Sequence, residues 1–496
     1  MGDPIRGAIG DERVSARHNE RAADGLWSPR RRALTIGLVL TITLVAFEAL
    51  AISTVMPVVA AELGGLDLYG WVFSAFFLGN LVGIVVVGGL IDRGGLIRPF
   101  VGGLTLFGVG LAIGGLAPTM PILVLGRLLQ GFGAGSIAPT AYVAIGRSLP
   151  EGLRARMFAT LSTAWVLPGV LGPALAGIIA QHSTWRAVFL GLIPLIALSG
   201  TLAVAGLRNV PAADPAHALS EHEAAADSAR RLPRAIVLAL AVALTLAGLS
   251  SPILVVGLPL TAVGLVLGIP AFRSLVPPGT LRARGRLPAA ILIRGLATFA
   301  FFAVDAYISL ALVAWRGTTP AEAGLALTAA TVSWTAGSWV QARSVVRQGA
   351  ARFVGVGLAT TVLGIGATAL VLVPAVPVLW AVPAFAIAGF GMGLSYSPLS
   401  LVVLAEAAPG TEGGATAGLQ LSDTLGTALG TGVAGAIVAA GARAGAEPWI
   451  GLAVAFAAGA AVGILGVALS PRLRRRGRIP QRALEGQATA METRAG

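Results

Sequence analysis

Three carboxylates lie inside long apolar stretches of the sequence: Glu48, Asp305 and Asp423. A charged side chain costs at least about 2.5 kcal/mol at the centre of a bilayer, so these groups are expected to face a cavity or a partner. Burial favours the neutral form of a carboxyl group, and access to water on alternate sides of a membrane would let it take up and release a proton. None of the four histidines lies in an apolar stretch, so carboxylates are the expected proton carriers.

Arg127 is a basic side chain in the same kind of apolar setting. Gln130 follows it at three residues, so the two share one helical face. An arginine inside a membrane is expensive unless it faces water or a partner. We predict that Glu48, Arg127 and Asp305 couple proton movement to function. The alternative is structural: Arg127 would be a buried ion-pair partner, and Asp305 would pair with an arginine such as Arg294.

Two further helical faces carry polar side chains. One is formed by Thr416, Gln420, Asp423 and Thr427, and the other by Trp334, Ser338 and Gln341. Inside a membrane such a face must meet water, a substrate or another polar helix. Substrate binding and hydrogen bonding between helices explain these faces equally well, and Trp334 would either stack on a flat substrate or pack among its neighbours. The residues predicted to line a substrate cavity are Gln420, Asp423, Trp334 and Tyr307.

The composition identifies the bilayer as the solvent of the fold. Hydrophobic residues make up 56% of the chain and charged residues only 11%, against roughly one quarter charged residues in soluble domains. Every basic side chain is an arginine, and the chain has no cysteine. The lack of cysteine excludes disulfides and thiolate chemistry. Without lysine the nucleotide-binding loop G-x-x-x-x-G-K-[ST] cannot occur, which excludes ATP-driven pumping by this chain.

Apolar stretches of about 20 residues recur along the chain and suffice for about fourteen membrane-spanning helices. They predict an all-α polytopic membrane protein with two six-helix bundles and an inserted two-helix hairpin. The predicted divisions are a cytoplasmic tail (1–32), an N-terminal six-helix bundle (33–207), a cytoplasmic linker (208–233), the extra hairpin (234–272), a cytoplasmic loop (273–289), a C-terminal six-helix bundle (290–470) and a second cytoplasmic tail (471–496).

Arginine placement predicts that both termini lie inside the cell. Cytoplasmic loops are richer in arginine than outer loops, and the predicted outer loops carry only Arg186, Arg316 and Arg443. The formal net charge of +13 lies in the tails and alternate loops rather than on one face that could bind nucleic acid. We therefore predict a multi-pass protein of a bacterial cytoplasmic membrane. Two similar halves are typical of secondary transporters, whose substrate site lies near the midplane between them.

The segment after the second predicted span, GGLIDRGG at 88–95, resembles the loop signature G-x-L-a-D-r-x-G-r-k of the major facilitator superfamily. The glycines permit a tight turn, and Asp92 can cap or pair at a neighbouring helix end. In that family the loop latches the inward gate. The resemblance implies a gating role for Gly88, Asp92, Arg93 and Gly95.

Further segments resemble the same family in chain order. LGRLLQGFG at 125–133 is similar to its l-x-x-R-x-x-q-G pattern around Arg127. FEALAISTVMP at 47–57 resembles the first-span pattern of the fourteen-span drug:proton antiporter branch, with Glu48 in place of the usual aspartate. The run WRAVFL at 185–190 also resembles that branch.

A fifth-span segment, LGPALAG at 171–177, resembles the antiporter signature G-P-x-x-G-G of the family. The matching residues are Gly172, Pro173 and Gly177. Glycine and proline bend and thin a helix, which allows close packing at the interface between bundles. The resemblance favours export over import.

The resemblance implies proton-coupled export of lipophilic or cationic organic compounds, as in multidrug efflux. The energy would come from the proton gradient and not from a cofactor, since one elementary charge moved through 100 mV is worth about 2.3 kcal/mol. The alternative in the same fold is a dedicated exporter of a native metabolite, lipid or siderophore. An enzyme is disfavoured because no predicted span holds histidine or cysteine, and a channel because no filter-like repeat occurs. The expected partners are protons, a small organic substrate and the lipid bilayer, with no nucleic acid, no metal and a monomeric state.

Overall fold

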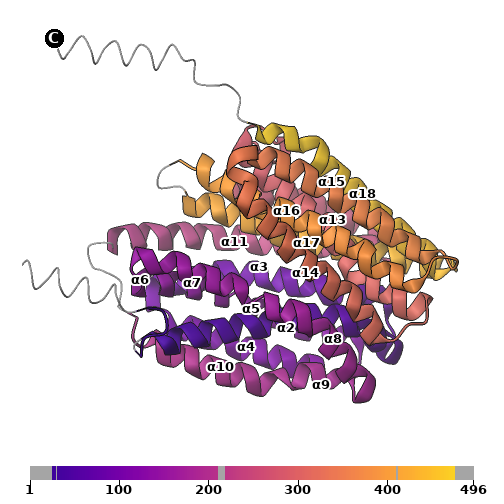
Figure 1. Cartoon of the computed structure of the whole chain (residues 1–496), viewed down its shortest axis with the longest axis horizontal. Coiled ribbons are helices and arrows are strands. Elements are labelled where there is room, and N and C mark those ends of the chain that lie inside the picture. The colour runs from indigo at the N-terminus through magenta and orange to yellow at the C-terminus, as the bar shows by residue number, and fades with distance from the viewer. Residues whose placement is uncertain (1–24, 30, 211–217, 409–411, 475–496) are drawn as a thin grey trace, which may run out of the picture.

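The computed structural model describes residues 25–29, 31–210, 218–408 and 412–474. Most of the two predicted tails and part of the predicted linker (208–233) therefore lie outside the described residues. Within the described ranges every regular element is a helix (Figure 1). Helices suit a bilayer because each satisfies its own backbone hydrogen bonds.

The helices follow one another with short connections. The N-terminal half contains α2 (Arg32–Leu63), η1 (Leu66–Leu68), α3 (Tyr69–Gly94), α4 (Ile97–Gly115), α5 (Met120–Ala134), α6 (Ile137–Ser148), α7 (Glu151–Thr163), α8 (Val166–His182), α9 (Trp185–Leu190) and α10 (Leu192–Leu207). A helical hairpin follows, made of α11 (Ala218–Ser250) and α12 (Leu254–Leu275). The C-terminal half contains η3 (Thr280–Arg282), α13 (Arg286–Leu310), the π-helical η4 (Ala311–Trp315), α14 (Pro320–Gln348), α15 (Ala350–Ala369), η5 (Leu370–Leu372), η6 (Val378–Trp380), α16 (Ala381–Glu406), α17 (Glu412–Arg443), α18 (Pro448–Leu469) and η7 (Ser470–Leu473).

Twelve helical stretches of the described chain are long and apolar enough to cross a membrane. The sequence predicted about fourteen spans, and two of those predicted spans are not among these twelve stretches. The predicted span 158–181 falls on α7 and α8, which are separate helices, and α8 is apolar but has only 17 residues. The predicted span 321–342 falls on α14, which is 29 residues long but more polar, with Glu322 and Gln341 among its side chains.

The two halves lie side by side, with α11 along their boundary (Figure 1). Helix α11 packs on α12, on α3 of the N-terminal half and on α17 of the C-terminal half. Near the end of α11, Leu246 lies so close to Gly432 of α17 that a Cβ on this glycine would meet the leucine side chain at 2.5 Å. The hairpin is thus attached to both halves through α11.

Close contact between α3 and α5 fixes the position of Arg127. A Cβ added to Gly131 of α5 would lie 1.8 Å from the carbonyl oxygen of Phe76 in α3, so only glycine fits. Small residues permit such an approach of two helices in a membrane protein. The Arg127 side chain, one turn before Gly131, is thereby held against α3.

The segment that resembles the antiporter signature lies at the boundary between the halves, where α8 packs on α14. A Cβ on Gly177 would meet Ala321 Cα at 2.7 Å, and a Cβ on Gly324 would meet the carbonyl oxygen of Pro173 at 2.8 Å. Gly172 lies on a roomier part of α8, because its added Cβ would be 3.6 Å from the nearest atom, in Phe47. Two of the three predicted residues therefore contribute directly to close packing between the halves.

The halves are joined at one end of the molecule by a layer of contacts. Tyr69 of α3 donates a hydrogen bond to the carbonyl of Ala306 (3.2 Å), and Tyr307 donates one to the carbonyl of Thr431 (3.3 Å). The rings of Tyr69 and Tyr307 lie 5.0 Å apart. Nearby, Arg443 pairs with Asp67 at 2.6 Å. We call Tyr69, Ala306, Tyr307 and Thr431 the contact layer, and this end of the molecule the closed end.

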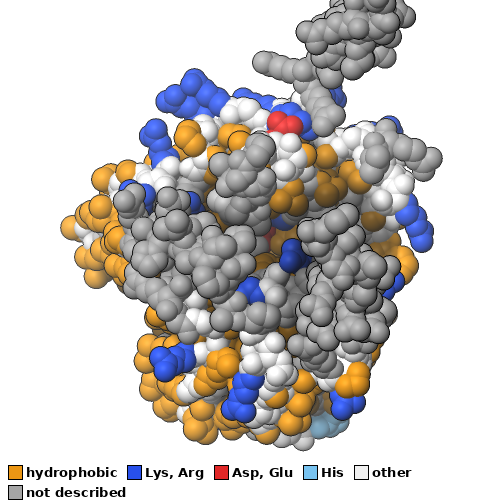
Figure 2. Space-filling view, turned by 90° about the vertical axis from the view of Figure 1, so that its left-hand side faces the viewer, with side chains coloured by type: hydrophobic (Ala, Val, Ile, Leu, Met, Phe, Trp, Pro, Cys, Tyr) orange, Lys and Arg blue, Asp and Glu red, His pale blue; other side chains and the backbone are white. Residues whose placement is uncertain are grey.

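The opposite end carries many arginines. Figure 2 looks onto it and shows arginine side chains distributed over this surface between apolar flanks. Arg98 lies in the first turn of α4, Arg147 in the last turn of α6 and Arg208 at the end of α10. We call it the arginine-rich end.

Candidate functional site

Glu48 and Arg127 form a buried ion pair between α2 and α5. Arg127 Nη1 donates to Glu48 Oε1 and also to Gln130 Oε1 (3.1 Å), and Gln130 Nε2 donates to Glu48 Oε1 at 3.3 Å. Both charged residues are 2% exposed. The structure thus brings together two residues of the predicted proton-coupling set, and it adds Gln130 as a bridge between them.

Arg127 is also tied to α3. Its Nε donates to the carbonyl of Val72 at 3.1 Å, and its guanidinium lies 4.4 Å from the centre of the Phe76 ring. One arginine therefore connects α2, α3 and α5. Helix α3 also packs on α17 of the other half, so Arg127 is linked through α3 to the boundary between the halves.

The second oxygen of the Glu48 carboxyl has a different environment. Glu48 Oε2 is buried and has no hydrogen-bond partner among the described residues. Glu48 lines a small recess with Ile52 of α2 and with Val188 and Phe189 of α9. A buried carboxylate oxygen without a partner is costly, and protonation of the group removes much of that cost. The sequence predicted Glu48 but not this apolar wall, although both α9 residues belong to the 185–190 segment.

Asp305 lies at the boundary between the halves and not beside Arg294. Ser53 Oγ of α2 donates to Asp305 Oδ2 of α13 at 3.4 Å. Asp305 is 9% exposed and directly precedes Ala306 and Tyr307 of the contact layer. The alternative prediction of an Asp305–Arg294 pair is therefore wrong.

Arg294 pairs with Asp423 instead. Its Nε lies 3.5 Å from Asp423 Oδ1, while Nη1 donates to the carbonyl of Tyr396 (2.8 Å) and Nη2 to Ser400 Oγ (2.7 Å). Tyr396 OH donates to Asp423 Oδ2 at 2.9 Å. The Tyr396 ring lies 5.3 Å from that of Trp334. This Asp423 cluster joins α13, α14, α16 and α17.

Two predicted cavity residues belong to this cluster, and two lie apart from it. Asp423 and Trp334 meet through Tyr396, which the sequence reasoning missed, although Tyr396 and Ser400 stand four residues apart on one face of α16. Gln420 is exposed about one turn from Asp423. Tyr307 is fully buried in the contact layer, and its place in a substrate cavity stays a prediction.

Of the predicted gating loop, the structure describes the backbone and the glycines. Gly95 ends α3 with φ at 82°, a left-handed conformation that favours glycine. Gly88 lies in the last two turns of α3 with open space around it. The side chains of Asp92 and Arg93 lie outside the described part of the chain. In that part no group of three or more metal-ligating side chains occurs.

Comparisons with known proteins identify the family of this chain. Residues 37–315 match the family model described as Major Facilitator Superfamily. A probable multidrug-efflux transporter of Mycobacterium tuberculosis is 30% identical over 388 residues, which cover 75% of this chain and 79% of that protein. Multidrug resistance protein 3 of Bacillus subtilis is 34% identical over 166 residues, which span only 34% of this chain and 32% of the relative. The crystal structure of a D-xylose-proton symporter has the same fold, with a TM-score of 0.62, 15% identity and coverage of 88% of this chain and 96% of that one.

Apolar helical spans in two packed halves of the described chain, together with relatives named as transporters, define a multi-pass membrane transporter. With a family match over more than half its length and a relative of 30% identity over most of it, the chain belongs to the Major Facilitator Superfamily.

Proposed function

We propose that this chain is a proton-coupled antiporter that exports lipophilic or cationic organic compounds across a bacterial cytoplasmic membrane. The observation that carries the proposal is the buried Glu48–Arg127 pair, in which one carboxylate oxygen has no partner among the described residues. The names of the bacterial relatives, which refer to multidrug efflux or resistance, support the substrate class.

We further propose that the chain has fourteen spans, with N-in and C-in topology, and belongs to the fourteen-span drug:proton antiporter branch. In this proposal α8, extended by α7, and α14 cross the membrane in addition to the twelve apolar stretches. The two helices pack against each other at the boundary between the halves, and each also carries exposed apolar side chains on another face, such as Leu171 of α8 and Val332 of α14. Helices α11 and α12 form the inserted hairpin. The arginine-rich end then faces the cytoplasm and the closed end faces outwards.

Proton uptake by Glu48 would remove the counter-ion of Arg127. With Glu48 ionised, the pair is neutral overall and Gln130 holds both partners. Protonation of Glu48 relieves the cost of its unpartnered Oε2 but leaves Arg127 as a buried charge without a counter-ion, which is unfavourable by roughly 3–5 kcal/mol in comparable buried pairs. Because Arg127 also holds the Val72 carbonyl of α3, this penalty favours a movement of α3 relative to its neighbours.

Asp305 would act as the second proton-coupling carboxyl. It contacts Ser53 across the boundary between the halves, immediately beside the contact layer. Opening of the closed end would separate α2 from α13 and bring water to Asp305. Its protonation would therefore change with the conformational state, which is the requirement for coupling.

The Asp423 cluster is the proposed substrate site. Asp423 Oδ1 has no hydrogen-bond partner among the described residues, and the aromatic rings of Tyr396 and Trp334 lie beside it. A carboxylate next to aromatic faces suits an organic cation. Arg294 in the same cluster supports the alternative, a dedicated exporter of a metabolite, lipid or siderophore that carries an anionic group.

Proteoliposomes containing a pH-sensitive dye test the proposal. Addition of a cationic aromatic substrate to wild-type protein should evoke proton movement, and Glu48→Gln and Asp305→Asn should each abolish it. Glu322→Gln is a matched control, because this exposed carboxylate lies in the first turn of α14 and its hydrogen bonds are with Thr319. Proton movement that persists in both Glu48→Gln and Asp305→Asn would overturn the assignment. A preference for anionic substrates would favour the alternative.

A further inference from the structure

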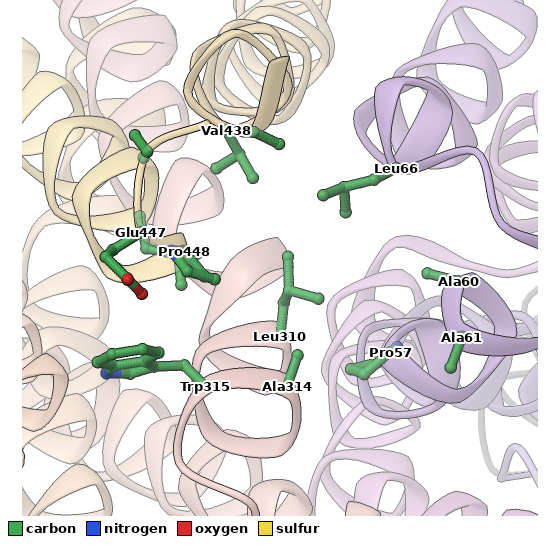
Figure 3. Close-up of a pocket in the computed structure, with 14 residues that line it drawn as sticks. Pro57, Ala60, Ala61, Leu66, Leu310, Ala314, Trp315, Val438, Glu447 and Pro448 are labelled. Atoms are coloured by element: carbon green, nitrogen blue, oxygen red, sulfur yellow. The ribbon is translucent and has the colours of Figure 1, made fainter. Parts of the chain in front are cut away.

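A second cavity lies between the two halves at the closed end. It has a volume of about 280 Å³, near the lower limit of roughly 300–1,000 Å³ for ligand pockets. Figure 3 shows Pro57, Ala60, Ala61 and Leu66 of the N-terminal half on one wall, and Glu447, Pro448 and Trp315 of the C-terminal half on the other. Leu310 and Ala314 lie between the two walls.

This cavity is separate from the sites described above. Pro57 follows Ser53 by one turn on the same face of α2, so the cavity begins where the Ser53–Asp305 contact ends. Leu310 lies three residues beyond Tyr307 of the contact layer. The contact layer therefore stands between this cavity and the Glu48 and Asp423 sites.

The walls are apolar, with one charged side chain among the lining residues. Pro57, Leu310 and Val438 are buried, whereas Glu447 is exposed. In Figure 3 the carboxylate of Glu447 lies on the same side of the cavity as the Trp315 ring. Trp315 is held in place because its Nε1 donates to the carbonyl of Leu372 at 2.9 Å.

The arginines near this end are engaged with other groups. Arg316 donates to a set of loop carbonyls that includes Val373 (3.0 Å) and Val376 (2.9 Å). Arg443 pairs with Asp67. Glu447 is the charged side chain that lines the cavity, and the tryptophan ring adds an electron-rich face.

We infer that this outer cavity is a binding site for a small lipophilic organic cation, bound by Glu447 and Trp315 from the outer side of the membrane. A permanently charged aromatic ammonium fits the chemistry: its apolar body contacts the alanine, proline and leucine walls while its charge faces the carboxylate and the indole ring. Existence of the site does not depend on proton coupling.

Occupation of the outer cavity has a consequence for transport, which rests on the proposed function. Residues of both halves line the cavity, so the cavity exists only while the two halves are in contact at the closed end. A ligand that binds one conformation better shifts the population towards it. An external cation at this site therefore holds the protein closed on the outside and slows export without competing for the Asp423 cluster.

Binding of radiolabelled benzyltrimethylammonium to the purified protein in nanodiscs tests the inference. Glu447→Gln should weaken binding roughly threefold to fivefold, the range expected for a partly exposed charge pair. Ala442→Leu, which fills the cavity, should abolish binding. Glu322→Gln removes an exposed carboxylate outside the cavity and should change nothing. Benzoate, an aromatic anion of similar size, should not compete.

Two results would overturn the inference. Loss of binding in Asp423→Asn together with normal binding in Glu447→Gln would assign the ligand to the Asp423 cluster. Equal binding in wild type, Glu447→Gln and Ala442→Leu would exclude the outer cavity. Because no gradient is applied, this measurement is independent of whether protons are exchanged, and failure of the proteoliposome experiment would leave it intact.

Discussion

Ser53 of α2 donates a hydrogen bond to Asp305 of α13 at 3.4 Å, and this bond crosses the boundary between the two halves. A carboxyl group at this position experiences two environments as the halves separate. In the closed state it is 9% exposed and has a hydroxyl partner. In the open state water would replace that partner.

The first prediction separates the charge of Asp305 from its hydrogen bond. Asp305→Asn retains a group that can accept from Ser53 but cannot ionise, so substrate-evoked proton movement should be lost. Ser53→Ala keeps the carboxyl and removes one hydrogen bond, worth roughly 0.5–1.5 kcal/mol, so the rate should fall by no more than about tenfold. Both are measured in proteoliposomes with a pH-sensitive dye. A larger loss in Ser53→Ala than in Asp305→Asn would contradict a role of the carboxyl in coupling.

The second prediction concerns the stability of the Glu48–Arg127 pair. Arg127→Met leaves Glu48 buried without its counter-ion and should lower the free energy of unfolding by roughly 3–5 kcal/mol. The double variant Glu48→Gln with Arg127→Met removes both charges and should be more stable than Arg127→Met alone. Thermal unfolding of each variant in detergent gives the stabilities to be compared.

A more exposed pair serves as the control for that measurement. Arg286 and Glu406 are 20% and 31% exposed at their side chains. Glu406→Gln should therefore cost no more than about 1 kcal/mol. If Glu406→Gln and Arg127→Met destabilise the protein equally, burial does not decide the strength of the central pair.

The membrane fold was predictable because its signals are local. The apolar stretches of the sequence predicted all twelve helical spans that are long and apolar enough in the described chain, and arginines lie at many of the helix ends. The other two predicted spans are weaker for a physical reason. Helix α8 is short, and α14 carries polar side chains such as the buried Gln341, which packs inside the protein and not against lipid.

The site was predictable only in part. Glu48 and Arg127 were recognisable because an isolated charge in an apolar run is expected to face a cavity, water or a partner, but the sequence did not predict that they pair with each other. The pairing of Arg294 was not recognisable. Asp305 lies on the same helix as Arg294, whereas Asp423 lies on α17, and only the packing of the helices decides between them. The apolar wall of Val188 and Phe189 beside Glu48 depends on packing in the same way.

The third prediction tests the close packing of α8 on α14. Gly177→Leu introduces a side chain where a Cβ alone would lie 2.7 Å from Ala321 Cα, so the halves could not approach at the closed end. The variant should favour the outward-open conformation and lose transport. Gly108→Leu is the matched control, since nothing lies within 4 Å of its added Cβ. Transport by Gly177→Leu at the wild-type rate would show that this contact is not needed.

The chain has no cysteine, so introduced cysteines can carry spin labels at chosen positions. Ala61 and Ala444 are exposed on opposite halves at the closed end. The distance between labels on them should increase when this end opens. Gly177→Leu should show the longer distance, and Gly108→Leu should not.

The fourth prediction uses the same labels to examine the Asp67–Arg443 pair. This pair joins the halves at the closed end, with side chains 56% and 26% exposed. An exposed ion pair is worth roughly 0.2–1 kcal/mol, so Asp67→Asn should raise the ratio of open to closed molecules by no more than about fivefold. The effect should shrink at high salt, because salt screens exposed charges. The exchanged variant, Asp67→Arg with Arg443→Asp, should restore the wild-type ratio, since it retains the attraction with the charges reversed. If Asp67→Asn leaves the distance distribution unchanged at low salt, the pair does not stabilise the closed state, and the contact layer of Tyr69 and Tyr307 must hold this end by itself.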